Sequence, residues 1–77
     1  MNNSTASQVK TFGELAQGTV VNFHRSVTAD DTNFVVLRQY SDRWGLFTEV
    51  LNLDTFEKDS FTQHTPIDGM WSIVKEH

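Results

Sequence analysis

The sequence contains no cysteine, one proline and four glycines, and it is poor in basic residues. Without cysteine neither a disulfide framework nor a thiolate metal site can form, so apolar packing must stabilise a domain of 77 residues. Six basic residues against ten acidic ones give a formal net charge of −4, the wrong sign for general binding to duplex DNA or to anionic membranes. The glycines are isolated from one another, which excludes a glycine-rich phosphate-binding loop.

Long apolar segments are also missing. No stretch approaches the roughly 18 apolar residues of a membrane-spanning helix. Residues 1–8 are polar and have neither the positive start nor the apolar run of a secretory signal. We therefore expect a cytoplasmic protein with a disordered tail at residues 1–8 and a single small domain over residues 9–77.

Residues 11–18 predict one short helix near the N-terminus. Thr11 and Glu14 have the spacing of a capping box, and Gly18 is able to end the helix in the left-handed conformation. Phe12 and Leu15 are three residues apart, so we expect them to share the buried face.

Five later segments have the composition or alternation of β-strands. They cover residues 19–24, 33–40, 46–53, 56–63 and 70–74, and the connections between them are short. Five short strands expose two sheet edges unless the sheet closes on itself. The prediction is a mainly β domain, a small five-stranded antiparallel barrel with one short N-terminal helix.

Two parts of the chain resemble a known family. Residues 12–19, FGELAQGT, are similar to the F-x-E-L-x-x-G-x opening of small SH3-like β-barrel proteins of bacterial and phage genomes. Residues 50–55, Phe61 and residues 65–67 resemble the later A-x-N-L-x-T-G, F and D-T-P-V elements of that pattern, although Phe56 replaces the usual turn glycine. The resemblance implies an SH3-like barrel. Most such proteins have no assigned activity, so it implies no functional residue.

Groups for catalysis or metal binding are sparse. His24, His64 and His77 show no spacing that pairs them as metal ligands. Ser60 and His64 are residue types used in nucleophilic catalysis, but positions four apart in a strand lie roughly 13 Å from each other. We therefore expect no enzyme activity, no metal and no cofactor.

Acidic residues are concentrated in the second half of the chain. Residues 41–77 hold seven acidic and three basic residues, whereas residues 1–40 are balanced. Carboxylates along residues 49–59 would steer a basic protein partner, and aromatic residues at 40–44 would anchor it. The alternative is a solvated face that keeps the domain soluble. The candidate partner-binding residues are Tyr40, Arg43, Trp44, Glu49, Asp54, Glu57 and Asp59.

These features predict a small, acidic, non-enzymatic protein-binding domain that acts by contact and occlusion. The family resemblance adds a phage-type inhibitor of a host protein as one version of that function. One alternative is a barrel that binds single-stranded nucleic acid through Arg38, Tyr40, Arg43 and Trp44, which combine cations with stacking rings. Another is a homodimer or structural homo-oligomer, since nine aromatic residues are many for a core of this size.

Overall fold

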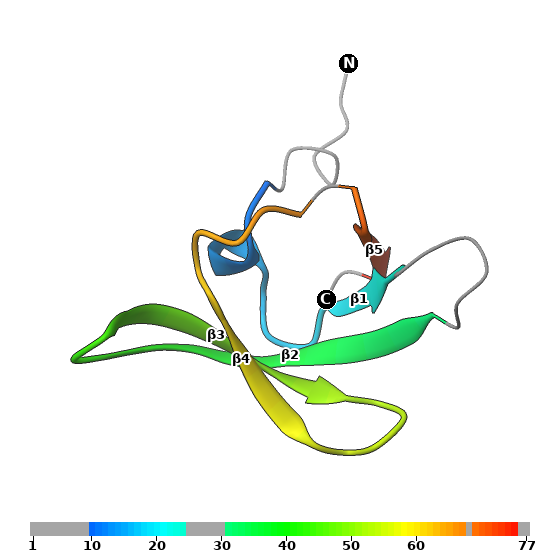
Figure 1. Cartoon of the computed structure of the whole chain (residues 1–77), viewed down its shortest axis with the longest axis horizontal. Helices are drawn as coiled ribbons and strands as arrows, with labels where there is room; N and C mark the ends of the chain where they lie inside the picture. Colours follow the sequence, from blue (N-terminus) through cyan, green and yellow to red (C-terminus); the bar gives the residue numbers. More distant parts are fainter. Residues whose placement is uncertain (1–9, 25–30, 68, 76–77) are drawn as a thin grey trace.

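The computed structural model describes residues 10–24, 31–67 and 69–75 (Figure 1). Its elements in chain order are one turn of 3-10 helix, η2 (Phe12–Glu14), and the strands β1 (Val20–Phe23), β2 (Thr32–Asp42), β3 (Gly45–Asn52), β4 (Lys58–Thr62) and β5 (Trp71–Lys75). The strands form one antiparallel sheet in the order β4-β3-β2-β1-β5. The prediction of a mainly β domain with five antiparallel strands is confirmed. The tail expected at residues 1–8 lies outside the described residues.

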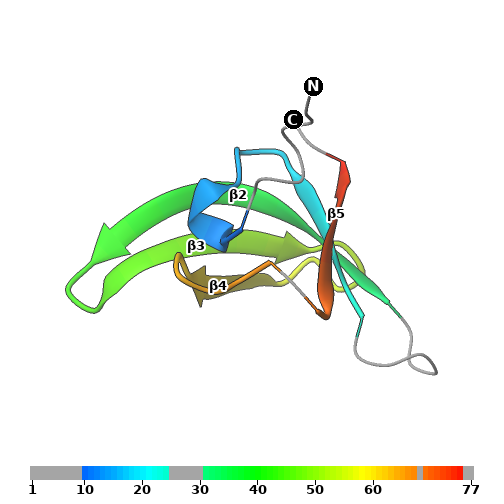
Figure 2. The ribbon, with the colours of Figure 1, turned by 90° about the horizontal axis from the view of Figure 1, so that it is seen from above.

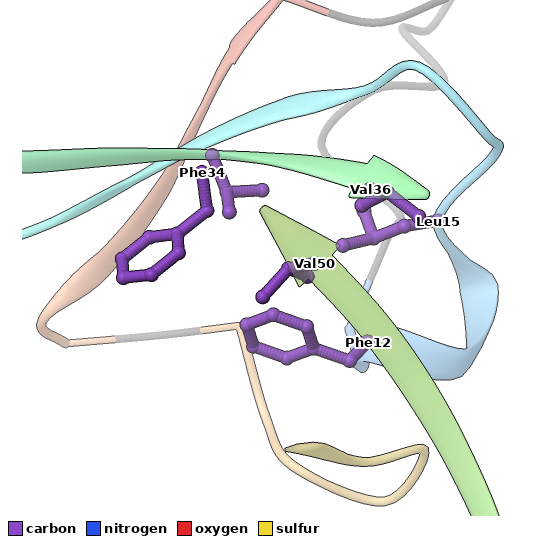
Figure 3. Packing of buried hydrophobic residues seen from close by; sticks show 6 residues of the cluster. Phe12, Leu15, Phe34, Val36 and Val50 are labelled. Carbon is purple, nitrogen blue, oxygen red and sulfur yellow. The ribbon is translucent and has the colours of Figure 1, made fainter. Parts of the chain in front are cut away.

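The sheet is strongly curved, and η2 lies on its concave side (Figure 2). The core is small and comes from η2, the residue that follows it, and strands β1 to β3 (Figure 3). Its fully buried side chains include those of Phe12, Val21, Val36 and Val50. Phe12 and Val50 point toward each other in the close view. In the described part of the chain, no helix has the length and apolar character needed to cross a membrane.

The capping box predicted at Thr11 does not form. Thr11 makes no side-chain capping hydrogen bond, and Leu15 already has extended backbone angles, φ −82° and ψ 135°. The carboxylate of Glu14 instead accepts a hydrogen bond from the backbone nitrogen of Lys10, 3.1 Å away. The expected short helix is present as a single turn of 3-10 helix, and Phe12 and Leu15 are both buried as predicted.

Tertiary hydrogen bonds replace the local cap. The backbone nitrogens of Phe12 and Gly13 donate to the carbonyl oxygens of Thr65 and Gln63, at 2.9 and 3.0 Å. The side-chain amide of Gln39 donates to the carbonyl oxygens of Phe12 and Leu15, at 2.9 and 3.0 Å. These bonds satisfy polar groups of the turn from both sides, so further helical turns are not needed to pair them.

The predicted barrel closure is wrong. Strands β4 and β5 are the two edges of the sheet, and no pairing joins them in the described residues. Pro66, in the connection between them, has no N–H group to donate and forms only an isolated bridge with Thr11. Side chains fill part of the gap instead: the ring centroids of Phe12, Phe61 and Trp71 lie 4.9 to 5.3 Å from one another. Aromatic packing therefore joins the two edges where a backbone ladder was expected.

A glycine is required where η2 contacts the connection after β4. A Cβ atom at Gly13 would lie 2.8 Å from Cβ and 3.0 Å from the backbone oxygen of Gln63. We expect Gly13→Ala to separate the two segments and to lower the free energy of unfolding by about 1–3 kcal/mol, the usual cost of overpacking. Urea denaturation measures this change. An exposed residue of the same segment provides the control, since Gln17→Ala should change stability by less than about 0.5 kcal/mol, and equal stability of the two variants would contradict the expectation.

Candidate functional site

A β-bulge decides which side chains of β2 face outward. The register of β2 against β3 shifts between Val36 and Arg38. Before the shift Val36 pairs with the buried Val50, and after it Arg38 pairs with Glu49 on the opposite face of the sheet. Simple alternation from Phe34 and Val36 would have turned Arg38 toward the core. The bulge instead places Arg38 and Tyr40 together on the outer face, as bulges commonly re-aim side chains.

These outward side chains form a connected group. The guanidinium carbon of Arg38 lies 4.6 Å from the centroid of the Tyr40 ring, and its Nε donates to Glu49 Oε1 at 2.9 Å. The ring of Tyr40 stacks on Phe47 with centroids 5.6 Å apart. The hydroxyls of Tyr40 and Ser60 share a 3.0 Å hydrogen bond. Each contact restricts a rotamer, so the group is held in one arrangement before any partner arrives.

The turn between β2 and β3 carries the most exposed large apolar side chain of the described residues. Trp44 is 74% exposed, and the guanidinium carbon of Arg43 lies 4.6 Å from its ring centroid. Asp42 shapes the turn, because its carboxylate accepts a hydrogen bond from the Trp44 backbone nitrogen at 2.8 Å. This turn lies at the end of the β2–β3 hairpin, away from β1 and β5 (Figures 1 and 2). We name the whole group the hairpin surface: Arg38, Tyr40, Arg43, Trp44, Phe47 and Glu49.

The acidic candidates do not form one face. Glu49 belongs to the hairpin surface and pairs with Arg38. Asp54 and Glu57 lie in the turn between β3 and β4, at the opposite end of β3 from Trp44. Asp59 pairs with the core-facing Val50, so it lies on the other side of the sheet from Glu49. The seven candidate residues are therefore divided among three places, and the two turns are separated by the length of β3, about 23 Å.

Phe56 occupies a strained position in the β3–β4 turn. Its φ is 61°, in the left-handed region where only glycine is free of steric cost, and its side chain is 72% exposed. Asn52 closes the turn, because its side-chain oxygen accepts hydrogen bonds from the backbone nitrogens of Asp54 and Thr55 at 2.8 and 3.1 Å. Phe56 therefore has a backbone conformation that favours glycine.

A cavity of about 430 Å³ opens between the two edges of the sheet. It lies at the end of the sheet where β1 stops and β2 starts, so it is distant from the hairpin surface. We name it the edge cavity. Its walls combine four aromatic rings with one carboxylate and three uncharged polar side chains, namely Phe23, Phe34, Phe61, Trp71, Asp59, Thr32, Asn52 and Thr65. The excess of aromatic residues predicted that some rings, Phe34 and Trp71 among them, would be incompletely buried, but the strand pattern does not show that they line a cavity at an open edge.

His24 joins a carboxylate and a hydroxyl in the order of a catalytic triad, but all three side chains are exposed on the surface. His24 contacts the carboxylate of Asp31 through Nδ1 at 3.1 Å and the hydroxyl of Ser72 through Nε2 at 3.3 Å, on the surface. His77 lies outside the described residues. Among residues 10–24, 31–67 and 69–75, no three histidine, aspartate or glutamate side chains gather as a metal site.

Comparison with known proteins gives no family assignment. No family model matches the chain, and no curated protein and no solved structure is significantly similar to it.

Replacing Phe56 by glycine should stabilise the protein. Phe56→Gly removes about 1–2 kcal/mol of left-handed strain, which exceeds the roughly 0.4–1 kcal/mol that the greater freedom of glycine in the unfolded chain costs. The exposed ring contributes little packing that would be lost. We expect a rise in the free energy of unfolding of about 0.5–1 kcal/mol, measured by urea denaturation. Phe56→Ala is the matched control, because it removes the ring and keeps the strain; a gain of the same size in that variant would disprove the account.

Proposed function

We propose that the protein is a non-enzymatic protein-binding domain that acts by contact and occlusion through the hairpin surface. The observation that carries the proposal is the exposed Trp44 at the end of a hairpin whose other aromatic and arginine side chains are already held in place. Tryptophan, tyrosine and arginine are the residues that contribute most to protein interfaces. A preorganised group of them loses little side-chain entropy on binding.

The charge of this surface favours protein over nucleic acid as the partner. Arg38 is bound to Glu49, and Arg43 lies one residue from Asp42, so the two cations are matched by two carboxylates. A surface without net positive charge gains little from phosphate groups, which supply most of the affinity of nucleic-acid binding. Stacking on Tyr40 and Trp44 alone would leave such binding weak.

The SH3-like assignment is part of this proposal. One antiparallel sheet with β4 and β5 at its edges is the arrangement that closes into a small barrel when those edges meet, which supports the resemblance carried by residues 12–19, 50–55, 61 and 65–67. A phage-type inhibitor of a host protein, acting in the cytoplasm, is the version of the function that this resemblance favours. The acidic net charge of −4 suits a basic partner surface.

Trp44→Ala tests the hairpin surface. We expect this variant to keep its fold, because the ring is exposed, and to bind the partner at least about thirtyfold more weakly, the effect of losing an interface anchor of about 2 kcal/mol. The partner is first captured on the immobilised wild-type protein from a lysate of the source organism, with and without nuclease, and its affinity is then measured by calorimetry. Val74→Ala is the matched control, since Val74 is an exposed apolar residue on β5.

Three outcomes would contradict the proposal. Equal affinity of the Trp44→Ala and wild-type proteins would exclude the hairpin surface. Loss of all bound material on nuclease treatment would favour the nucleic-acid alternative. A captured protein that is only a second copy of this chain would favour the homo-oligomer.

A further inference from the structure

Aromatic rings make up half of the residues that line the edge cavity. Trp71 is central: its ring centroid lies 4.7 Å from that of Phe23, 5.6 Å from that of Phe34 and 5.3 Å from that of Phe61. These contacts come from four different strands, so the wall is fixed by the fold and is not a mobile loop. Its volume of about 430 Å³ is within the range of pockets that hold small ligands.

One carboxylate gives the cavity its charge. Asp59 and Phe61 both line the cavity. They are two residues apart on β4, so their side chains lie on the same face of the strand. None of the eight lining residues is basic, and Asp59 forms no salt bridge with any residue the structure describes. Its Oδ1 accepts one hydrogen bond, from the backbone nitrogen of Ser60 at 2.9 Å. The carboxylate therefore has no internal counter-ion among these residues.

We propose that the edge cavity binds an organic cation, an alkylammonium or guanidinium group of the kind that ends lysine and arginine side chains. Aromatic faces attract cations through the ring quadrupole, and they favour cations that give up their water easily. Asp59 adds a direct charge interaction. The Asp59 carboxylate would repel an anion. A metal ion would have only one charged ligand in this cavity. The site is independent of the hairpin surface, which lies at the other end of the sheet.

Asp59 also has a possible structural role at the sheet edge, and the experiment must distinguish that role from ligand binding. Edge strands often carry an inward-pointing charge that prevents pairing with another chain. In that role Asp59 would protect β4 and would have no effect on ligand binding. The two explanations differ in what happens when the carboxylate becomes an amide of the same shape.

The experiment is an NMR titration of the full chain, observed at the indole N–H of Trp71. Tetramethylammonium, ethylguanidinium and the peptide acetyl-Gly-Arg-Gly-amide are the cationic probes, and tert-butanol is the uncharged probe of similar size. We expect the three cations to shift the Trp71 signal and to leave that of Trp44 unchanged. Tighter binding of the peptide than of ethylguanidinium would assign the site to a protein side chain, and equal binding would assign it to a free cation; both agree with the proposal.

Two matched variants complete the test. Asp59→Asn should weaken each cation about fivefold, the effect of one partly exposed charge. Asp54→Asn removes a carboxylate from the neighbouring turn, outside the cavity, and should leave binding unchanged. Equal binding of tert-butanol and tetramethylammonium, an unchanged affinity in Asp59→Asn, or no shift at Trp71 with any cation would each overturn the proposal.

Discussion

The burial of Phe12 is the contact on which the rest of the structure depends. Its fully buried ring lies between the two sheet edges, against Phe61 of β4 and Trp71 of β5. A sheet of five short strands with open edges has little core of its own. The Phe12 ring provides the contact between the two edges that strand pairing would provide in a closed barrel. The backbone around Phe12 is tied by hydrogen bonds to Gln39 of β2 and to Thr65 beyond β4. The N-terminal turn therefore acts as part of the core and not as an appendage.

The two candidate surfaces follow from two local departures from regular β-structure. The bulge after Val36 turns Arg38 and Tyr40 outward, where they form the hairpin surface with Phe47. The missing pairing between β4 and β5 opens the edge cavity on the other side of the sheet. A regular closed barrel would have directed Arg38 inward and covered the cavity. Irregularity of the sheet is thus what makes both surfaces available, in keeping with the frequent position of bulges beside functional sites.

The sequence predicted the strands well because their signal is local. Alternation and β-branched composition depend only on neighbouring residues, and the five expected segments all overlap observed strands. The capping box at Thr11 and Glu14 was wrong because tertiary hydrogen bonds to Gln63 and Thr65 satisfy the turn. Barrel closure and the position of Asp59 depend on register and on contacts between distant strands, which no local pattern encodes. The aromatic residues near Arg38 were recognised as a group, but their orientation was set by a bulge that leaves no clear mark in the sequence.

The nine aromatic residues fall into three groups, and only two of them are separate from other rings. Five of the rings join in one cluster around the edge gap, and Tyr40 and Phe47 stack on the outer face. Only Trp44 and Phe56 are more than 70% exposed, and each lies in a hairpin turn, where a polar residue or glycine would fold more easily. Crowding of the core does not explain them, because the turns lie outside it. At Phe56 the left-handed backbone adds a direct stability cost. The proposed protein contact gives a reason for Trp44, because an exposed aromatic side chain in a turn suits a contact with another molecule.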